Sequence, residues 1–309
     1  VAFPVYRRWR EDAPEKVREI LTLPYFRRRG VLEELVRRRI RLPFVRRPFL
    51  KLDNQAYRLD YLLLRIPVQP RKFVFIALTS SLYHRSFLTD KSLKKGSVTL
   101  TDSMVVIAFG RKTEDLEPLG QIGIDVNERN VTWSDTKGRT EQVSISEVAE
   151  IKERYKAIRA EIAGRTHRDR RVQRDLLSKY GKRERERTAQ RIHHVTKKIV
   201  EHAMTNKLGI VMEKLRGIRK LYRKGNGQGR SYRGRLNSWS FREIQRQIAY
   251  KAAWEGIPVR YVNARGTSRN CLCGSRMEEL EGRRMRCPSS GREWDRDVIA
   301  SKNMMAAPL

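Results

Sequence analysis

The sequence has few cysteines, few acidic residues and no long hydrophobic segment. Its three cysteines all lie between positions 271 and 287. They are too few for the paired disulfide framework of a secreted domain, and their clustering is typical of metal ligands. The longest apolar runs, 73–78 and 104–109, are far shorter than the ~18 residues that span a membrane. Because charged residues such as Arg7 and Arg8 interrupt the start of the chain, we expect no signal peptide and a cytoplasmic protein.

The charge balance indicates the kind of partner. Lysine and arginine number 68 against 35 aspartate and glutamate, which gives a formal net charge of +33 over 309 residues. Such an excess is typical of proteins that bind a polyanion. Hydrophobic residues make up 39% of the chain, which excludes a disordered basic tail. The sequence therefore predicts a folded nucleic-acid protein of about two domains, at roughly 150 residues each.

Three regions differ in texture. Residues 1–48 are arginine-rich and predict a partial helical region. Residues 49–118 contain short apolar strands separated by Pro, Gly, Asp and Ser clusters, which favours a small antiparallel β-barrel or sandwich. Residues from 119 onward predict three strands followed by helices that alternate with two more strands. That order, βββ–α–β–α–β–α, is typical of an α/β ribonuclease-H-like fold.

The third region can be divided further by apolar periodicity and capping residues. The predicted strands are 121–126, 131–133, 142–145, 208–212 and 259–262. The predicted helices are 148–162, 168–206 with a break near Gly181, one that begins after Ser240 and ends near Gly256, and one that begins near Asp295.

Three acidic residues stand at the ends of these elements. Asp125 ends the first strand of the third region, Glu213 ends the strand 208–212, and Asp297 follows the predicted N-cap Asp295. Each alone is typical of a turn or a helix cap. Hydrolysis of a phosphodiester by two Mg²⁺ ions needs several carboxylates in one pocket, because hard cations take oxygen ligands. The ordered set on a basic chain therefore predicts a catalytic metal site.

The cysteines have nearly the spacing of a zinc ribbon. Cys271 and Cys273 form a C-x-C pair, which is one residue short of the usual C-x₂-C. Cys287 is followed by Ser290 where a fourth thiolate would stand, and no histidine follows His202. With three thiolates we expect a degenerate ribbon over 265–291 that binds zinc weakly or not at all.

A basic segment lies between 214 and 235. It contains nine basic residues, no acidic ones, and two tyrosines among glycines. Cations and rings on a flexible chain suit contact with a phosphate backbone and bases, and the alternative is a solvated loop that orders only on binding. The candidate nucleic-acid-binding residues are Arg216, Arg219, Lys220, Arg223, Lys224, Arg230, Arg233 and Arg235.

Several short motifs occur in the order found in one known family. They are Gly123-Ile124-Asp125, Val211-Met212-Glu213, Trp239-Ser240-Phe241, Tyr250-Lys251-Ala252, Thr267-Ser268 before the cysteines, and Asp295-Arg296-Asp297 with Asn303. With these motifs, residues 49–309 resemble the TnpB (OrfB) proteins of insertion sequences, which are often called transposases and are relatives of type V CRISPR effectors.

The resemblance implies an RNA-guided DNA endonuclease with one RuvC-like active site. It implies a wedge-like β-barrel over 49–118, a nuclease domain over 119–264 and 292–309, and an inserted zinc ribbon over 265–291. Residues 1–48 would be part of the family's helical recognition region.

The family's functional residues can be placed on this chain. The catalytic acids correspond to Asp125, Glu213 and Asp297, which would hold two Mg²⁺ or Mn²⁺ ions. The ribbon ligands correspond to Cys271, Cys273, Cys287 and Ser290. The implied partners are a guide RNA from the element's own 3′ end and a double-stranded DNA target, which suggests a place in the nucleoid.

Two other functions stay open at this point. A nuclease-inactive or decayed copy could repress DNA by RNA-guided binding alone, and a general basic RNA-binding protein would share the same charge. The three acids disfavour both alternatives, because neither function needs them.

Overall fold

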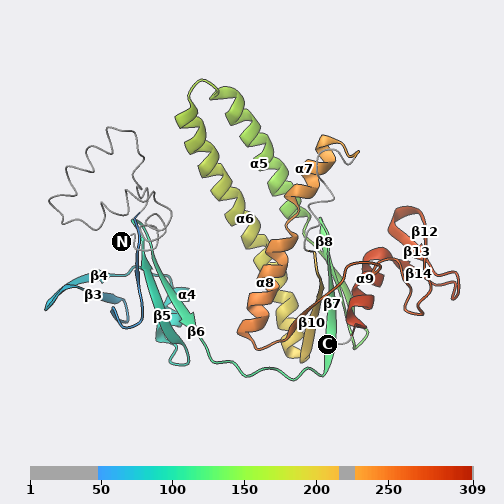
Figure 1. The fold of residues 1–309 in the computed structure, drawn as a ribbon, viewed down its shortest axis with the longest axis horizontal. Helices are drawn as coiled ribbons and strands as arrows, with labels where there is room; N and C mark the ends of the chain where they lie inside the picture. The colour runs from blue at the N-terminus through green and yellow to red at the C-terminus, as the bar shows by residue number, and fades with distance from the viewer. Residues whose placement is uncertain (1–47, 216–226, 308–309) are drawn as a thin grey trace, which may run out of the picture. The chain divides into compact units, whose positions relative to one another are not determined.

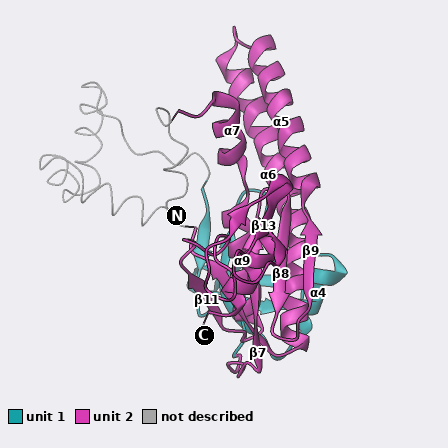
Figure 2. Cartoon of the chain, turned by 90° about the vertical axis from the view of Figure 1, so that its right-hand side faces the viewer, with its two compact units in different colours: residues 1–112 teal, residues 113–309 magenta. Residues whose placement is uncertain are grey.

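The computed structural model describes residues 48–215 and 227–307. The predicted helical region, up to residue 47, lies outside the described residues. Five of the candidate nucleic-acid-binding residues also lie outside them: Arg216, Arg219, Lys220, Arg223 and Lys224. The chain divides into two compact units, 1–112 and 113–309 (Figure 2). None of the described helices combines the length and the apolarity needed to span a membrane.

The first unit contains two three-stranded antiparallel sheets, ordered β1-β5-β6 and β2-β3-β4. Their strands are β1 (Leu50–Leu52), β2 (Arg58–Asp60), β3 (Leu63–Gln69), β4 (Lys72–Ala77), β5 (Lys94–Leu100) and β6 (Val105–Gly110). Residues from both sheets, including Leu64, Ile66 and Val98, form one buried core.

The expected β-barrel is therefore corrected to two sheets that share a core. Closing a barrel requires each edge strand to pair with another, and among the described strands no pairing joins the two sheets. β1 and β2 are only three residues long, so they offer few hydrogen bonds for closure. The short helix α4 (Leu82–Thr89) was not predicted, and it begins where the Ser81 side chain accepts a hydrogen bond from the His84 amide.

A five-stranded sheet forms the centre of the second unit, with the order β11-β10-β7-β8-β9. Strands β7, β8 and β9 pair antiparallel, whereas β10 pairs parallel to β7, and β11 parallel to β10. The strands are β7 (Gly120–Val126), β8 (Asn130–Asp135), β9 (Thr140–Ser144), β10 (Leu208–Glu213) and β11 (Val259–Val262). All five predicted strands of this region are thus present.

Helices cover both faces of this sheet, which explains the nearly continuous burial of β7, β8 and β10. One face packs against the helices α5 (Ser146–Arg165), α6 (Arg170–Thr205) and α8 (Phe241–Trp254) in the main hydrophobic core. The helix α9 (Arg296–Met305) packs against β7 and β8 on the other face. A side chain at Gly123 would collide with α9, because its Cβ would lie 2.1 Å from the Ser301 carbonyl oxygen.

The structure corrects two predictions, the break in the helix 168–206 and the loop at 230–235. α6 continues without a break through Gly181 as a 36-residue helix. It lies beside α5 in a long hairpin (Figure 1), and this packing offsets the roughly 1 kcal/mol helix penalty of glycine. Residues 230–235, predicted as part of a loop, belong to the helix α7 (Arg230–Ser238), which has no buried residue and therefore no apolar period to reveal it.

The cysteine region forms a small sheet of its own between β11 and α9. Its antiparallel strands are β12 (Glu278–Glu279), β13 (Arg284–Arg286) and β14 (Glu293–Asp295), with the 3-10 turn η2 (Glu281–Arg283) before β13. Its buried core contains Met277, Met285 and two of the cysteines, and it is continuous with Ile299 of α9. The ribbon is thereby attached to the helix that carries Asp297.

Candidate functional site

The fold brings the three predicted acids together at one edge of the five-stranded sheet. Asp125 is the last but one residue of β7 and Glu213 is the last residue of β10. Because these strands are parallel neighbours, with Met212 opposite Ile124, their carboxyl ends meet. Asp297 is added from the first turn of α9.

The N-terminus of α9 is fixed by Asp295, as the sequence predicted. The Asp295 Oδ1 atom accepts hydrogen bonds from the backbone amides of Asp297, at 2.8 Å, and of Val298, at 3.2 Å. Asp295 is thus the N-cap, which leaves the Asp297 side chain available for the site. Asp297 is nearly fully buried, with 2% of its surface exposed.

The charges of the other two acids act on Asp125. Burial, together with repulsion from Glu213 and Asp297, raises the pKa of Asp125 to about 8. The hydrogen bond from Asn127 and the charge of Arg283 act against this shift. Burial also raises the pKa of Glu213. A carboxyl group that keeps its proton near neutral pH marks a place where a cation would be strongly favoured.

Each carboxylate has a hydrogen-bond donor that orients it. Asn127 Nδ2 donates to Asp125 at 2.7 Å, Thr267 Oγ1 donates to Glu213 at 2.5 Å, and Asn130 Nδ2 lies 3.4 Å from Asp297 Oδ2. We did not predict these three side chains from the sequence. Their places in the sequence could have indicated them, because Asn127 and Asn130 follow Asp125 closely and Thr267 belongs to one of the motifs described above.

Arg283 is a further site residue that the sequence did not indicate. It comes from the 3-10 turn of the ribbon, and its guanidinium donates to Asp297 Oδ1 in an ion pair. Its charge also lowers the pKa of Asp125. In a chain with 68 basic residues, no local pattern separates this arginine from the others. Only the folding of the ribbon against α9 places it here.

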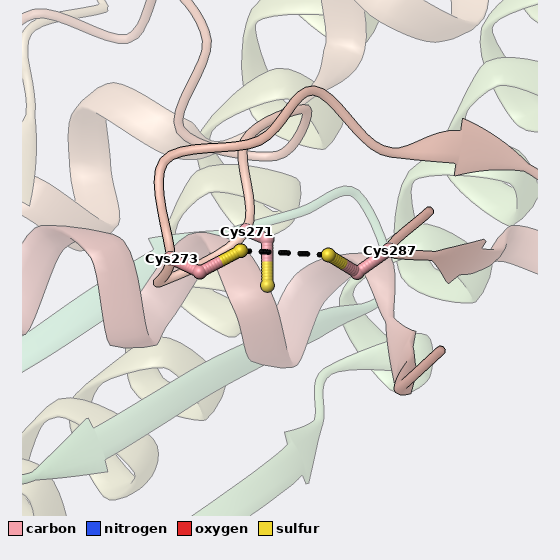
Figure 3. Close-up of side chains that lie close together, drawn as sticks. All are labelled: Cys271, Cys273 and Cys287. Carbon is pink, nitrogen blue, oxygen red and sulfur yellow. Dashed lines mark hydrogen bonds between the residues drawn. The ribbon is translucent and has the colours of Figure 1, made fainter. Parts of the chain in front are cut away.

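The three cysteines converge in the ribbon (Figure 3). Their sulfur atoms all lie within 4.8 Å of one another, and the Sγ atoms of Cys273 and Cys287 are 3.5 Å apart. The Ser290 side chain donates a hydrogen bond to Cys287. This bond, together with hydrogen bonds from the Ser290 backbone, Cys273 and Cys271, lowers the pKa of Cys287 to about 6. The structure thus brings Ser290 and all three thiols to one place, where thiolates are the donors that zinc prefers.

The described residues of the basic segment are 214–215, which follow β10, and 227–235, which include the start of α7. Arg235 is 3.2 Å from Glu128 in an ion pair, and Arg233 donates to the Gln228 carbonyl. Arg230 is exposed and has no ion pair with a described residue. Trp239, just after α7, donates to the Asn127 carbonyl at 2.8 Å, so α7 is held against the turn that follows Asp125.

Comparisons with known proteins indicate the family and the fold of the chain. A family model described as Cas12f1-like, TNB domain matches residues 241–304. A TnpB-like protein of Methanocaldococcus jannaschii is 30% identical over 250 residues, which covers 78% of this chain and 89% of that protein. The fold is similar to that of Cas12f1, solved by cryo-EM in complex with sgRNA and target DNA. That match has a TM-score of 0.59 and 13% identity, and it covers 90% of this chain and 70% of that one.

Proposed function

Because this chain belongs to the TnpB family, we propose that it is an RNA-guided, metal-dependent DNA endonuclease encoded by an insertion sequence. The observation that carries the proposal is that Asp125, Glu213 and Asp297 meet at one edge of the sheet, where burial and repulsion from the other two acids raise the pKa of Asp125 to about 8. Such a group of buried acids lowers the stability of the folded protein unless a cation binds to it.

The topology of the second unit supports a RuvC-like, ribonuclease-H-like nuclease domain. Three antiparallel strands followed by two parallel ones, with helices on both faces, give the order expected for that fold. We propose that 119–264 and 292–309 form this domain, that 265–291 is its degenerate ribbon, that 49–118 is the wedge-like domain, and that 1–48 belongs to the helical recognition region.

The donor set at the acid site fits Mg²⁺ or Mn²⁺. The three acids offer only oxygen ligands, as these hard cations require. Two such ions, when bound, would supply an activated water and stabilise the leaving 3′-oxygen. Asn127, Asn130 and Thr267 hold the carboxylates in position, while Arg283 balances part of their charge. At the ribbon, three thiolates and Ser290 fit a zinc ion held more weakly than in a four-cysteine site.

The proposed partners are a guide RNA from the element's own 3′ end and a double-stranded DNA target. Base pairing with the guide would choose the target sequence, while the basic protein binds the backbones. Arg230, Arg233 and Arg235, with Arg216, Arg219, Lys220, Arg223 and Lys224, are the proposed nucleic-acid contacts.

The decisive experiment reconstitutes the protein with its RNA and a matched DNA target in Mg²⁺. We expect alanine at Asp125, Glu213 or Asp297 to abolish cleavage and to leave RNA and DNA binding nearly intact. Double variants should be no worse than single ones, because the acids act as a unit. Asp295→Ala is the matched control: it loses a helix cap, about 1 kcal/mol, and should retain cleavage.

One outcome would replace the proposal. If the wild-type protein binds its guided target but does not cut it in the presence of any divalent metal tested, the chain is a nuclease-inactive copy that acts by occupying DNA.

A further inference from the structure

Two side chains of β8 carry buried polar atoms that have no hydrogen-bond partner among the described residues. They are Thr132, whose Oγ1 is unpartnered and whose surface is 0% exposed, and Asn130, whose Oδ1 is unpartnered. Thr132 is the direct cross-strand partner of Asp125, so the two side chains leave the same face of the sheet. Asn130 stands two residues before Thr132 and shares that face.

The orientation of the Asn130 amide is set by Asp297. Its Nδ2 lies 3.4 Å from the Asp297 carboxylate. The reversed amide would place two acceptor oxygens against each other, so the observed orientation is the favourable one. The carbonyl oxygen therefore remains without a donor beside the acid site.

The next polar residue on the same face is fully satisfied. Ser134 Oγ lies 2.7 Å from Ser301 Oγ and 2.9 Å from Thr140 Oγ1. Buried polar atoms without partners destabilise a fold, and native proteins keep few of them. The two unpartnered oxygens of β8 belong to residues that adjoin the acids, Thr132 as the cross-strand partner of Asp125 and Asn130 as the donor to Asp297, which suggests that a ligand satisfies them.

We propose that Asn130 Oδ1 and Thr132 Oγ1 belong to the oxygen shell of the divalent cation held by Asp125 and Asp297. This inference rests on the proposed metal-dependent function. A hard cation takes about six oxygen ligands. Neutral oxygens supply ligands without adding to the repulsion that already raises the pKa of Asp125.

Binding of Mn²⁺ alone to the full chain, without nucleic acid, tests the proposal by calorimetric titration. Asn130→Leu should weaken Mn²⁺ binding by roughly 10- to 100-fold, the range found when partners of a metal site are removed. Thr132→Val, which is nearly isosteric, should weaken it in the same direction. Asn130→Asp should bind Mn²⁺ at least as tightly as the wild type, because it keeps an oxygen ligand and adds a negative charge while it loses the N–H donor.

Metal-free stability gives a second readout with the opposite sign. Thr132→Val removes an unpartnered hydroxyl, so its urea midpoint without metal should rise while its Mn²⁺ affinity falls. Ser134→Ala is the matched control on the same strand and face. It should lower the urea midpoint, because it breaks satisfied hydrogen bonds, and leave Mn²⁺ affinity unchanged.

The variant Asp125→Ala distinguishes failure of this inference from failure of the proposed metal site. If it loses Mn²⁺ binding while Asn130→Leu and Thr132→Val bind like the wild type, the inference is overturned and the proposed metal site stands. If Asn130→Asp loses as much affinity as Asn130→Leu, the N–H donor to Asp297 is what matters, and the inference is again overturned. If the wild type binds no more tightly than Asp125→Ala, the metal site itself fails and the inference fails with it.

Discussion

The carboxyl group of Asp125 shows how a single residue can be destabilising and still useful. It is 8% exposed and lies near two other carboxylates, and its pKa is about 8 against an ordinary value of 3.8. Between about pH 4 and pH 8, the folded protein therefore keeps a proton on Asp125 that the unfolded chain has already lost. The contribution of Asp125 to stability falls as the pH rises through this window.

We therefore expect a specific pH dependence of metal stabilisation. Without metal, the melting temperature should decrease as the pH rises from 5 to 8, and the increase caused by Mg²⁺ should grow over the same range, because the cation replaces the proton. Thermal denaturation with and without Mg²⁺ measures this. Asp125→Asn, which cannot ionise, should show a flatter metal-free profile; a profile as steep as that of the wild type would contradict the role of Asp125.

Ser290 allows a prediction on the ribbon. Ser290→Cys would provide a fourth thiolate next to Cys287, so zinc content per protein should rise and resist a chelator better than in the wild type. Ser289→Cys is the matched control, because the Ser289 hydroxyl lies 2.7 Å from Ser275 Oγ in the exposed part of the loop. Metal analysis after dialysis decides the point: full, chelator-resistant zinc in the wild type would contradict it.

At the scale of elements, two glycines have opposite effects on stability. Gly181 lies within α6, where an added Cβ would meet only Arg185 Nη1, at 3.7 Å. Gly123 lies in β7 beneath α9, where an added Cβ would lie 2.1 Å from the Ser301 carbonyl oxygen and 2.5 Å from the Met305 amide nitrogen. The first glycine is a cost to helix stability, and the second allows α9 to bring Asp297 to Asp125.

Alanine at these positions should therefore have effects of opposite sign. Gly181→Ala should raise the free energy of unfolding by about 1 kcal/mol, because alanine is the better helix former. Gly123→Ala should lower it and reduce cleavage as well, because α9 must move away from the sheet. Urea unfolding of both variants measures the difference; an unchanged or lowered stability for Gly181→Ala would show that the glycine serves the helix in another way.

At the scale of the whole molecule, the net charge of +33 governs encounters with nucleic acid. Many of these charges are exposed, and those without a neighbouring carboxylate are the ones available for phosphates. On α7, Arg230 is such a charge, whereas Arg235 is paired with Glu128. The same residue type on one helix is therefore expected to contribute unequally.

We expect the affinity for DNA to fall steeply with salt. Arg230→Ala should reduce the slope of log K against log[salt] by about 0.7 to 0.9, the value for one phosphate contact, and Arg235→Ala by less. Fluorescence anisotropy with a labelled duplex at several salt concentrations gives the slopes. Equal effects of the two substitutions would show that the ion pair with Glu128 does not persist in the complex.

Much of this protein follows from local sequence patterns. The five strands of the second unit, the N-cap Asp295 and the clustering of the cysteines were predictable, because strand periodicity, capping chemistry and ligand spacing act over a few residues. The positions of Asp125, Glu213 and Asp297 at element ends could also be identified, since each follows directly from where an element begins or ends.

Tertiary structure decided what depends on residues far apart in the chain. The ion pair of Arg283 with Asp297, the unpartnered oxygens of Asn130 and Thr132, and the two separate sheets in place of a barrel have no local pattern. The uninterrupted α6 likewise depends on its packing against α5. Sequence alone therefore determined which side chains could do the chemistry. Long-range packing decided which of them meet and which polar atoms stay without a hydrogen-bond partner, because burial and electrostatic interactions between distant segments exist only once those segments are in contact.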